Sequence, residues 1–233
     1  MVTCNKPDEH SWLCAIIAGG QSQRMGQDKA ELTFTDARGD LISVLERALI
    51  DALHLFGQEQ VRLVGPHSPL DDVTLLSDYC DQPYQGPLSA LAAALLEAKQ
   101  FRCDYVFTLP CDSLLRASDC LPALLSAMNQ QDAQAWVLTD QGRELPMMGV
   151  YRADLANQLT EYLDQGHRRL MRFLATICVE AVPLEALALY KAGFTEIAKI
   201  ASYNTPEEFE QAKLAFIKHQ ACYRQGDQNE ERT

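Results

Sequence analysis

The chain has 233 residues, 47% of them hydrophobic, which is enough to bury a full core in one α/β domain. Its formal net charge is −12, and a surface of this sign repels the phosphates of nucleic acid and of anionic membranes. We therefore expect neither nucleic acid nor a membrane as a partner, whereas a small phosphorylated ligand stays open, because a few backbone N–H groups and cationic side chains can bind it locally.

The eight cysteines are expected to be reduced and to have structural roles. None form a C-x-x-C pair, and several lie in apolar segments, where a free thiol packs as a small hydrophobe. A disulfide or zinc framework is the alternative. No stretch approaches the ~20 apolar residues that a membrane span requires, and the first residues lack an apolar core of signal length. The sequence predicts a soluble, cytoplasmic protein.

Short apolar runs alternate with helical patterns, which is typical of βαβ units and of a largely parallel sheet. The expected strands cover residues 13–17, 61–64, 73–76, 105–109, 136–139 and 146–152. The expected helices cover residues 41–57, a stretch that begins at Pro87, two segments on either side of Gly166, and a last segment after Thr205. Thr205, Pro206 and Glu208 have the spacing of a capped helix start.

One domain is predicted for residues 1–219. Residues 220–233 are polar and nearly free of large apolar side chains, so we expect a mobile tail there. Neither an internal repeat nor a long linker divides the chain.

The stretch "AGGQSQRMGQDKA" directly follows the first expected strand. Gly19 and Gly20 allow backbone angles closed to other residues, and without a Cβ their N–H groups can approach an anion closely. Arg24 adds a fork of donors that matches phosphate oxygens, and Lys29 adds a compact charge on a long stem. Together these residues predict a binding site for a triphosphate.

Two better-known phosphate-binding patterns do not fit this stretch. The dinucleotide-binding loop needs G-x-G-x-x-G, and the P-loop needs G-x-x-x-x-G-K followed by Ser or Thr. The alternative to a binding site is that Gly19 and Gly20 only make a turn and that Arg24 and Lys29 are solvated surface charges.

The whole stretch resembles the pyrophosphorylase loop of nucleotidyltransferases, and it is most similar to the molybdenum cofactor guanylyltransferases. Their pattern A-G-G-x-S-x-R-M-G-x-D-K is met by Ala18, Gly19, Gly20, Ser22, Arg24, Met25, Gly26, Asp28 and Lys29. The resemblance implies a three-layer, Rossmann-like α/β nucleotidyltransferase fold with a mostly parallel central sheet.

Four further segments extend the resemblance to about residue 215. Their family counterparts imply nucleotide contacts at Ala18, Gly19, Gly20, Lys29, Asp78, Gly86, Pro87, Leu88 and Asp112. The P-C-D turn implies that Asp112 also holds Mg²⁺. The glycine and double-arginine segment, and the turn before the last helix, imply substrate binding by Arg168, Arg169, Ser202 and Asn204.

The reaction that the resemblance implies is transfer of GMP from GTP to molybdopterin, with pyrophosphate as the second product. The attacking phosphate oxygen is already anionic, so catalysis rests on positioning and charge stabilisation by Arg24, Lys29 and Asp112. The expected partners are molybdopterin and, transiently, other molybdenum cofactor biosynthesis proteins and acceptor apoenzymes.

Two departures from the family pattern bear on specificity. Gly65, Pro66 and His67 stand where the family has an asparagine close to the guanine base, and Ser202 replaces one of two asparagines near the pterin. The alternatives are a related enzyme that uses CTP or another phosphorylated or alcohol acceptor, and a non-catalytic nucleotide-binding relative. Release of pyrophosphate separates an enzyme from a binding protein.

Overall fold

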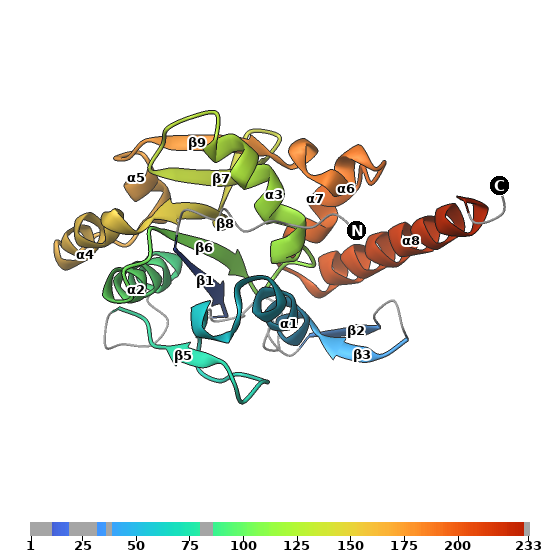
Figure 1. Ribbon diagram of the computed structural model, residues 1–233, viewed down its shortest axis with the longest axis horizontal. Coiled ribbons are helices and arrows are strands. Elements are labelled where there is room, and N and C mark those ends of the chain that lie inside the picture. Colours follow the sequence, from blue (N-terminus) through green and yellow to red (C-terminus); the bar gives the residue numbers. More distant parts are fainter. Residues whose placement is uncertain (1–10, 19–31, 36–38, 80–85, 231–233) are drawn as a thin grey trace.

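The structure is a computed structural model that describes residues 11–18, 32–35, 39–79 and 86–230, with side chains to residue 218. A seven-stranded sheet in the order β5-β4-β1-β6-β8-β7-β9 forms its centre, and helices cover both faces (Figure 1). Only β8 runs antiparallel to its neighbours among these strands. The predicted three-layer α/β fold with a mostly parallel sheet is therefore confirmed.

The first half of the sheet follows the expected strands closely. Its strands are β1 (Trp12–Ile17), β4 (Val61–Val64), β5 (Thr74–Leu76) and β6 (Tyr105–Pro110). Alternate residues of β1 enter two separate cores: Cys14 and Ile16 pack with α1 and α3, whereas Leu13 and Ala15 pack with α2, α4 and α5. A strand buried on both faces explains the continuous apolar run in the sequence.

The helices of one face are α1 (Val44–Phe56) and α3 (Ala117–Met128), and those of the other are α2 (Pro87–Gln100), α4 (Ala156–Asp164) and α5 (Leu170–Leu174). The two helices predicted on either side of Gly166 are confirmed as α4 and α5. Gly166 itself has φ +87°, in the left-handed region that favours glycine.

The helix expected over residues 41–57 begins later than predicted. Leu41–Ser43 forms strand β3, which pairs antiparallel with β2 (Thr33–Thr35) in a separate small sheet. Leu41 fitted the helical spacing but is exposed. Ser43 caps α1, and its hydroxyl accepts a hydrogen bond from the Glu46 N–H (3.0 Å). A capping residue at position 43 excludes Leu41 from the helix.

The second half of the sheet consists of β7 (Ala135–Asp140), β8 (Arg143–Arg152) and the edge strand β9 (Val179–Pro183). The expected strands at 136–139 and 146–152 are parts of β7 and β8, while β9 and the short helices after it lay outside the prediction. These are η4 (Leu184–Ala186), α6 (Ala188–Lys191) and α7 (Ile197–Ala201).

The last helix, α8, spans Pro206–Glu230. Its start is capped as expected, because the Thr205 hydroxyl accepts from the Glu208 N–H (3.2 Å), although the Glu208 carboxylate receives the N–H of Asn204 (2.6 Å). The helix continues through most of the predicted polar tail, where no proline interrupts it, and extends away from the sheet (Figure 1). The mobility of residues 220–233 and the domain bounds stay predictions.

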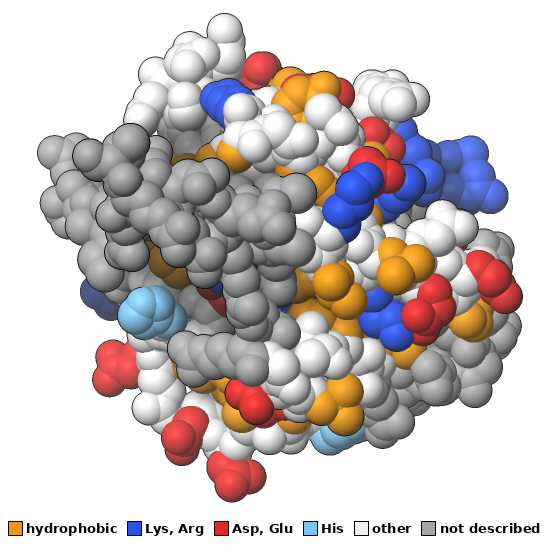
Figure 2. Space-filling view, turned by 90° about the vertical axis from the view of Figure 1, so that its right-hand side faces the viewer, with side chains coloured by type: hydrophobic (Ala, Val, Ile, Leu, Met, Phe, Trp, Pro, Cys, Tyr) orange, Lys and Arg blue, Asp and Glu red, His pale blue; other side chains and the backbone are white. Residues whose placement is uncertain are grey.

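The surface carries mixed charges on the side toward which α8 points. Acidic side chains are spread over this face with basic ones among them (Figure 2), in keeping with the net charge of −12. None of the helices in the described parts of the chain combines the length and the apolar character of a membrane span.

Candidate functional site

Three neighbouring strands end together at the carboxyl edge of the parallel half of the sheet. The Ala18 N–H donates to the carbonyl of Val64 (2.9 Å), and the Cys111 N–H donates to that of Ile17 (2.9 Å). The residues that follow β1, β4 and β6 are therefore held side by side. Ligands of open α/β sheets bind at this edge.

Asp112 lies in the turn just past the end of β6 and is partly buried. Its carbonyl accepts a hydrogen bond from the Tyr203 N–H (3.3 Å), and two residues later the Leu114 N–H donates to the carbonyl of Ile200 (2.8 Å). The Ser113 hydroxyl also donates to the Ile200 carbonyl (3.2 Å). The turn that carries Asp112 is thus bonded to the end of α7 and the segment after it.

Two predicted substrate-binding residues flank Tyr203 and so lie next to this turn. Ser202 is partly buried, and Asn204 is exposed, with its backbone N–H bonded to Glu208. The structure therefore brings the segment that contains Ser202 and Asn204 to Asp112, a pair of segments about 90 positions apart in the sequence.

The phenol of Tyr203 is buried beneath this contact. Burial raises its pKa above the ordinary value, and the nearby Cys111 and Asp112 raise it further, whereas Arg47 acts in the opposite direction. Tyr203 therefore stays a neutral phenol and shares an electrostatic environment with Asp112 and Arg47.

The predicted nucleotide residues Asp78 and Gly86 lie near the start of α2. Tyr79, next to Asp78, donates its N–H to the carbonyl of Ser89 in the first turn of that helix (3.4 Å). Gly86 adopts φ +90° and precedes Pro87 at the first helical position, while the side chain of Leu88 is fully buried. Leu88 can contact a ligand only through its backbone.

The turn with the two predicted arginines lies beside the same region. The Tyr79 hydroxyl bonds the Asp164 carboxylate at the end of α4 (3.2 Å). The Nη1 atom of Arg168 donates to the carbonyls of Leu163 and His167, so this guanidinium caps the end of α4. Arg169 is exposed at the start of α5. The structure places this turn near Tyr79 and α2, and among the described residues no hydrogen bond or ion pair joins it to Asp112.

The most specific part of the sequence pattern lies outside the described residues. Gly19, Gly20, Arg24 and Lys29 belong to residues 19–31, of which the structure describes nothing. Ala18, the residue before them, is described, and its N–H is bonded to the end of β4. Their roles stay predictions.

Gly65 is the first of the three residues that stand in the region where the resemblance implies an asparagine, and its surroundings are tight. A Cβ at position 65 would lie 3.2 Å from the Cβ of Ala18, closer than an ordinary van der Waals contact. A larger residue here would push against the start of the predicted phosphate-binding segment.

Asp112 is the candidate metal ligand within the described part of the chain. No group of three or more histidine, cysteine, aspartate or glutamate side chains able to hold a metal is present there. Mg²⁺ in nucleotide sites needs only one or two carboxylates, because substrate phosphates and water complete its shell. A single carboxylate at a strand end fits that requirement.

The expectation of structural cysteines agrees with those described. Cys14 and Cys120 are buried free thiols, Cys111 is buried as well, and Cys103 and Cys178 are free thiols nearer the surface. Burial raises the pKa of the Cys14 and Cys120 thiols. These two thiols are therefore unreactive core residues.

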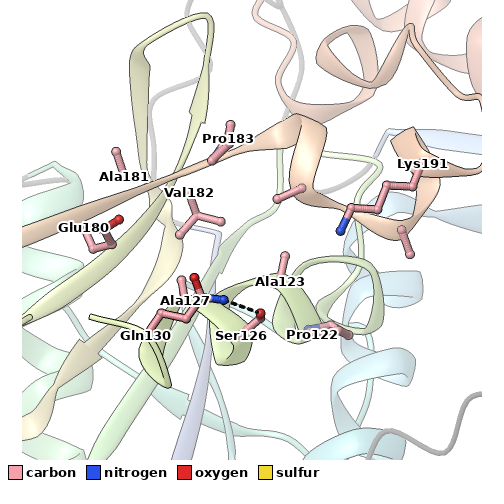
Figure 3. A pocket seen from close by; sticks show the side chains of 12 residues that line it. Pro122, Ala123, Ser126, Ala127, Gln130, Glu180, Ala181, Val182, Pro183 and Lys191 are labelled. Carbon is pink, nitrogen blue, oxygen red and sulfur yellow. Dashed lines mark hydrogen bonds between the residues drawn. The ribbon is translucent and has the colours of Figure 1, made fainter. Parts of the chain in front are cut away.

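A separate cavity of about 350 Å³ lies between α3, β9 and α6 (Figure 3). Mostly small side chains of α3 and β9 line it together with Gln130 and Glu180, and Lys191 reaches toward it from α6. It shares no residue with the strand-end site, and none of the predicted site residues lines it.

Sequence reasoning missed two residues that hold the site together, Tyr79 and Arg47. Tyr79 links the start of α2 to the end of α4, and the Nη1 atom of Arg47 in α1 donates to the carbonyl of Leu114 (2.8 Å). A signal for Arg47 was present: it borders the apolar face of α1, next to the buried Val44 and Ala48.

A family model described as the MobA-like NTP transferase domain matches residues 14–179 of the chain. A probable molybdenum cofactor guanylyltransferase of Synechococcus elongatus is 33% identical over 189 residues, which cover 75% of this chain and 89% of that protein. The molybdenum cofactor guanylyltransferase of Shewanella frigidimarina is 29% identical over 210 residues, covering 87% and 96%.

A solved structure agrees with the fold. The molybdopterin-guanine dinucleotide biosynthesis protein A of Archaeoglobus fulgidus superposes with a TM-score of 0.66 at 18% identity, covering 88% of this chain and 98% of that one. At this identity the likeness supports the fold and carries no residue roles.

Proposed function

Since the chain belongs to the MobA-like NTP transferase family, we propose that it transfers GMP from GTP to molybdopterin and releases pyrophosphate. Nucleotidyl transfer follows from the family. GTP and molybdopterin are the proposed substrates, because relatives that share about a third of the sequence are named for guanylyl transfer to the molybdenum cofactor.

The single observation that carries the proposal is the alignment of the strand ends. The bonds from Ala18 to Val64 and from Cys111 to Ile17 hold the residue before the glycine loop beside the residue before Asp112. The segment in which the sequence puts Arg24 and Lys29 thus begins, after Ala18, next to the turn that carries Asp112. A triphosphate bound there would meet both kinds of charge.

In the proposed reaction, an oxygen of the terminal phosphate of molybdopterin attacks the α-phosphorus of GTP. A new phosphorus–oxygen bond forms, and the bond between the α-phosphorus and the oxygen that bridges to the β-phosphate breaks, with its electron pair leaving on pyrophosphate. Arg24 and Lys29 would stabilise the charge that develops on the leaving group, and Gly19 and Gly20 would donate backbone N–H groups. The chain then contributes orientation and electrostatics, and no covalent nucleophile.

Asp112 would hold Mg²⁺, which supplies charge neutralisation at the phosphate oxygens when bound. The turn suits this role because it is hydrogen-bonded to Ile200 and Tyr203, so the carboxylate is attached to a fixed main chain. A fixed carboxylate costs less reorganisation when charge develops.

The proposed acceptor side comprises Ser202, Asn204, Arg168 and Arg169. The first two are supported by the bond between Tyr203 and Asp112, which brings their segment to the metal carboxylate. Arg169 is the better placed of the two arginines for an anionic ligand, since Arg168 already bonds two carbonyls at the end of α4. Transient contacts with other biosynthesis proteins and acceptor apoenzymes are part of the proposal.

We expect GTP to be preferred over CTP, with a smaller margin than in relatives that keep the asparagine. Backbone groups can read guanine, since a main-chain carbonyl accepts from the N2 amino group and a main-chain N–H donates to O6. In this proposal, such groups would come from the segments of Asp78, Gly86 and Leu88, which lie at the start of α2. Unpaired buried groups would then penalise other bases.

The test is to incubate the purified chain with Mg²⁺, molybdopterin and each nucleoside triphosphate in turn. We expect a dinucleotide and pyrophosphate with GTP, and much less of either with CTP or ATP. Faster turnover with CTP would reject the guanylyl assignment and retain nucleotidyl transfer. Nucleotide binding without pyrophosphate release, for every acceptor tried, would reject the enzyme and favour the non-catalytic alternative.

A further inference from the structure

Arg47 occupies an unusual place for a guanidinium. It comes from α1, is partly buried, and its Nη1 atom donates to the carbonyl of Leu114, two residues after Asp112. The guanidinium carbon lies 4.7 Å from the ring centre of Phe216 in α8 and 5.6 Å from that of Phe34 in β2. One side chain thus contacts the Asp112 turn and two elements outside the main sheet.

The cost of this placement calls for an explanation. Burial, together with the nearby Arg116, lowers the pKa of Arg47 to about 10, although Asp119, Asp51 and Tyr203 act in the opposite direction. The fold therefore holds this positive charge at a cost in solvation. An apolar side chain of similar length would fill the same space between Phe34 and Phe216 without that cost. What such a residue could not supply is the hydrogen bond to Leu114.

That bond completes the fixation of the turn. The Leu114 N–H already donates to Ile200, and the Leu115 N–H bonds the Ser113 hydroxyl (3.0 Å). With Arg47, both backbone polar groups of Leu114 are bonded, one to α7 and the other to α1. The turn is thus bonded to two helices, α1 before it in the sequence and α7 after it. These bonds leave the backbone of Asp112 little freedom to rotate.

We propose that Arg47 is a positioning residue for the transfer reaction, which acts through the Leu114 carbonyl by fixing the turn that carries Asp112. The proposal rests on the proposed function for its effect on turnover. Its structural part, the fixation of residues 112–115, stands on the contacts alone.

Two variants separate positioning from plain structural support. Arg47→Met keeps the bulk of the side chain and removes the donor and the charge, and Arg47→Lys keeps the charge and one donor group. We expect Arg47→Met to lower kcat by about tenfold to a hundredfold with a smaller change in the KM for GTP, because misplacing a reacting group slows the chemical step. Arg47→Lys should recover part of this loss.

The readout independent of activity is amide hydrogen exchange. In Arg47→Met, the amides of Leu114 and Leu115 should exchange about tenfold faster or more than in the wild type, while those in the centres of β1 and β6 keep their rates. The melting temperature should change little, since a buried charge has been replaced by an apolar group.

Arg62 offers a matched control. It is a buried arginine of β4 that bonds Glu97 (2.6 Å) and two backbone carbonyls, and stacks on Phe101 at 4.9 Å. Arg62→Met should lower the melting temperature, because it leaves Glu97 without this partner. It should change neither the exchange of residues 114–115 nor the kcat of the folded fraction.

Normal exchange at residues 114–115 in a folded Arg47→Met would overturn the fixation, and normal kcat despite faster exchange would overturn its role in turnover. If Arg47→Met does not fold, Arg47→Lys decides by the same two readouts, with intermediate values expected. A wild-type chain without transferase activity would reject the proposed function instead, while hydrogen exchange would still decide whether Arg47 holds the turn.

Discussion

At the residue scale, the backbone of the Asp112 turn is held by hydrogen bonds that do not involve the Asp112 side chain. The turn bonds Tyr203 and Ile200 through main-chain groups, so a substitution of the side chain leaves these bonds in place. We predict that Asp112→Asn folds normally and loses both activity and affinity for Mg²⁺, because a neutral oxygen replaces an anionic ligand. Titration of activity against Mg²⁺, together with the melting temperature, measures both.

Full activity of Asp112→Asn at low Mg²⁺ would exclude Asp112 as the metal ligand. Asp119 provides a comparison, because it is a carboxylate of α3 that bonds Arg116 and lies in none of the proposed binding groups. Asp119→Asn should leave the Mg²⁺ dependence unchanged, even if the helix start becomes weaker.

Lys29 was assigned from the sequence alone, and it lies outside the described residues. We expect a lysine at the end of "RMGQDK" to add positive charge at the leaving phosphates and to contribute little to packing. Lys29→Ala should therefore lower kcat by about a hundredfold, or about 3 kcal/mol of transition-state stabilisation, with an unchanged melting temperature. Single-turnover rates with saturating GTP would measure this, and near-normal rates would remove Lys29 from the mechanism.

At the element scale, the sequence predicted what local patterns can encode. Residues 13–17 and 61–64 are apolar runs bounded by turns, and Pro87 and Thr205 mark helix starts, so these elements appear as predicted. Residues 41–43 are predicted as helix because Leu41 fits the helical spacing, whereas the Ser43 cap starts the helix after them and the pairing with β2 makes them a strand.

The site was predictable to the same degree. Asp112 and Ala18 follow buried strands, and the ends of parallel strands meet at one edge, so their proximity follows from the pattern. The bonds from Tyr203 to Asp112 and from Arg47 to Leu114 join segments that lie about 90 and 67 positions apart in the sequence. Such contacts depend on how helices pack, which a single sequence does not state.

Strand β8 illustrates how tightly the central sheet is packed. At Gly149, an added Cβ would lie 2.5 Å from the carbonyl oxygen of Trp136 and 3.0 Å from a methyl group of Val137, both in β7. We predict that Gly149→Ala lowers the free energy of unfolding by about 2 kcal/mol, because β7 or β8 must shift to admit the methyl group. Urea unfolding measures the change, and Arg143→Ala, at the exposed start of the same strand, is the control.

At the scale of the whole molecule, one sheet separates two apolar cores, and both contain groups that must stay neutral in the folded state. Cys14 and Cys120 lie in the core on the side of α1 and α3, and Tyr151 in that on the side of α2. Burial raises the pKa of all three above their ordinary values. The fold therefore retains protons that the unfolded chain releases in alkali.

The stability of the fold should consequently fall as the pH rises above about 9, where free thiols ionise. Because the folded-state pKa is raised, the stabilisation is complete below that pH and is lost above it, since only the unfolded chain releases the proton. Between pH 9 and 10 each buried thiol contributes a loss that approaches about 1.4 kcal/mol per pH unit. Urea unfolding at several pH values under reducing conditions measures the slope.

Cys120→Ala should lower the stability at pH 7 through the small cavity it leaves, and yet make the alkaline slope less steep. The exposed Cys178 is the matched control, so Cys178→Ala should leave the slope as it is. An equal slope in the wild type and in Cys120→Ala would show that the Cys120 thiol does not contribute to the alkaline limit of this fold.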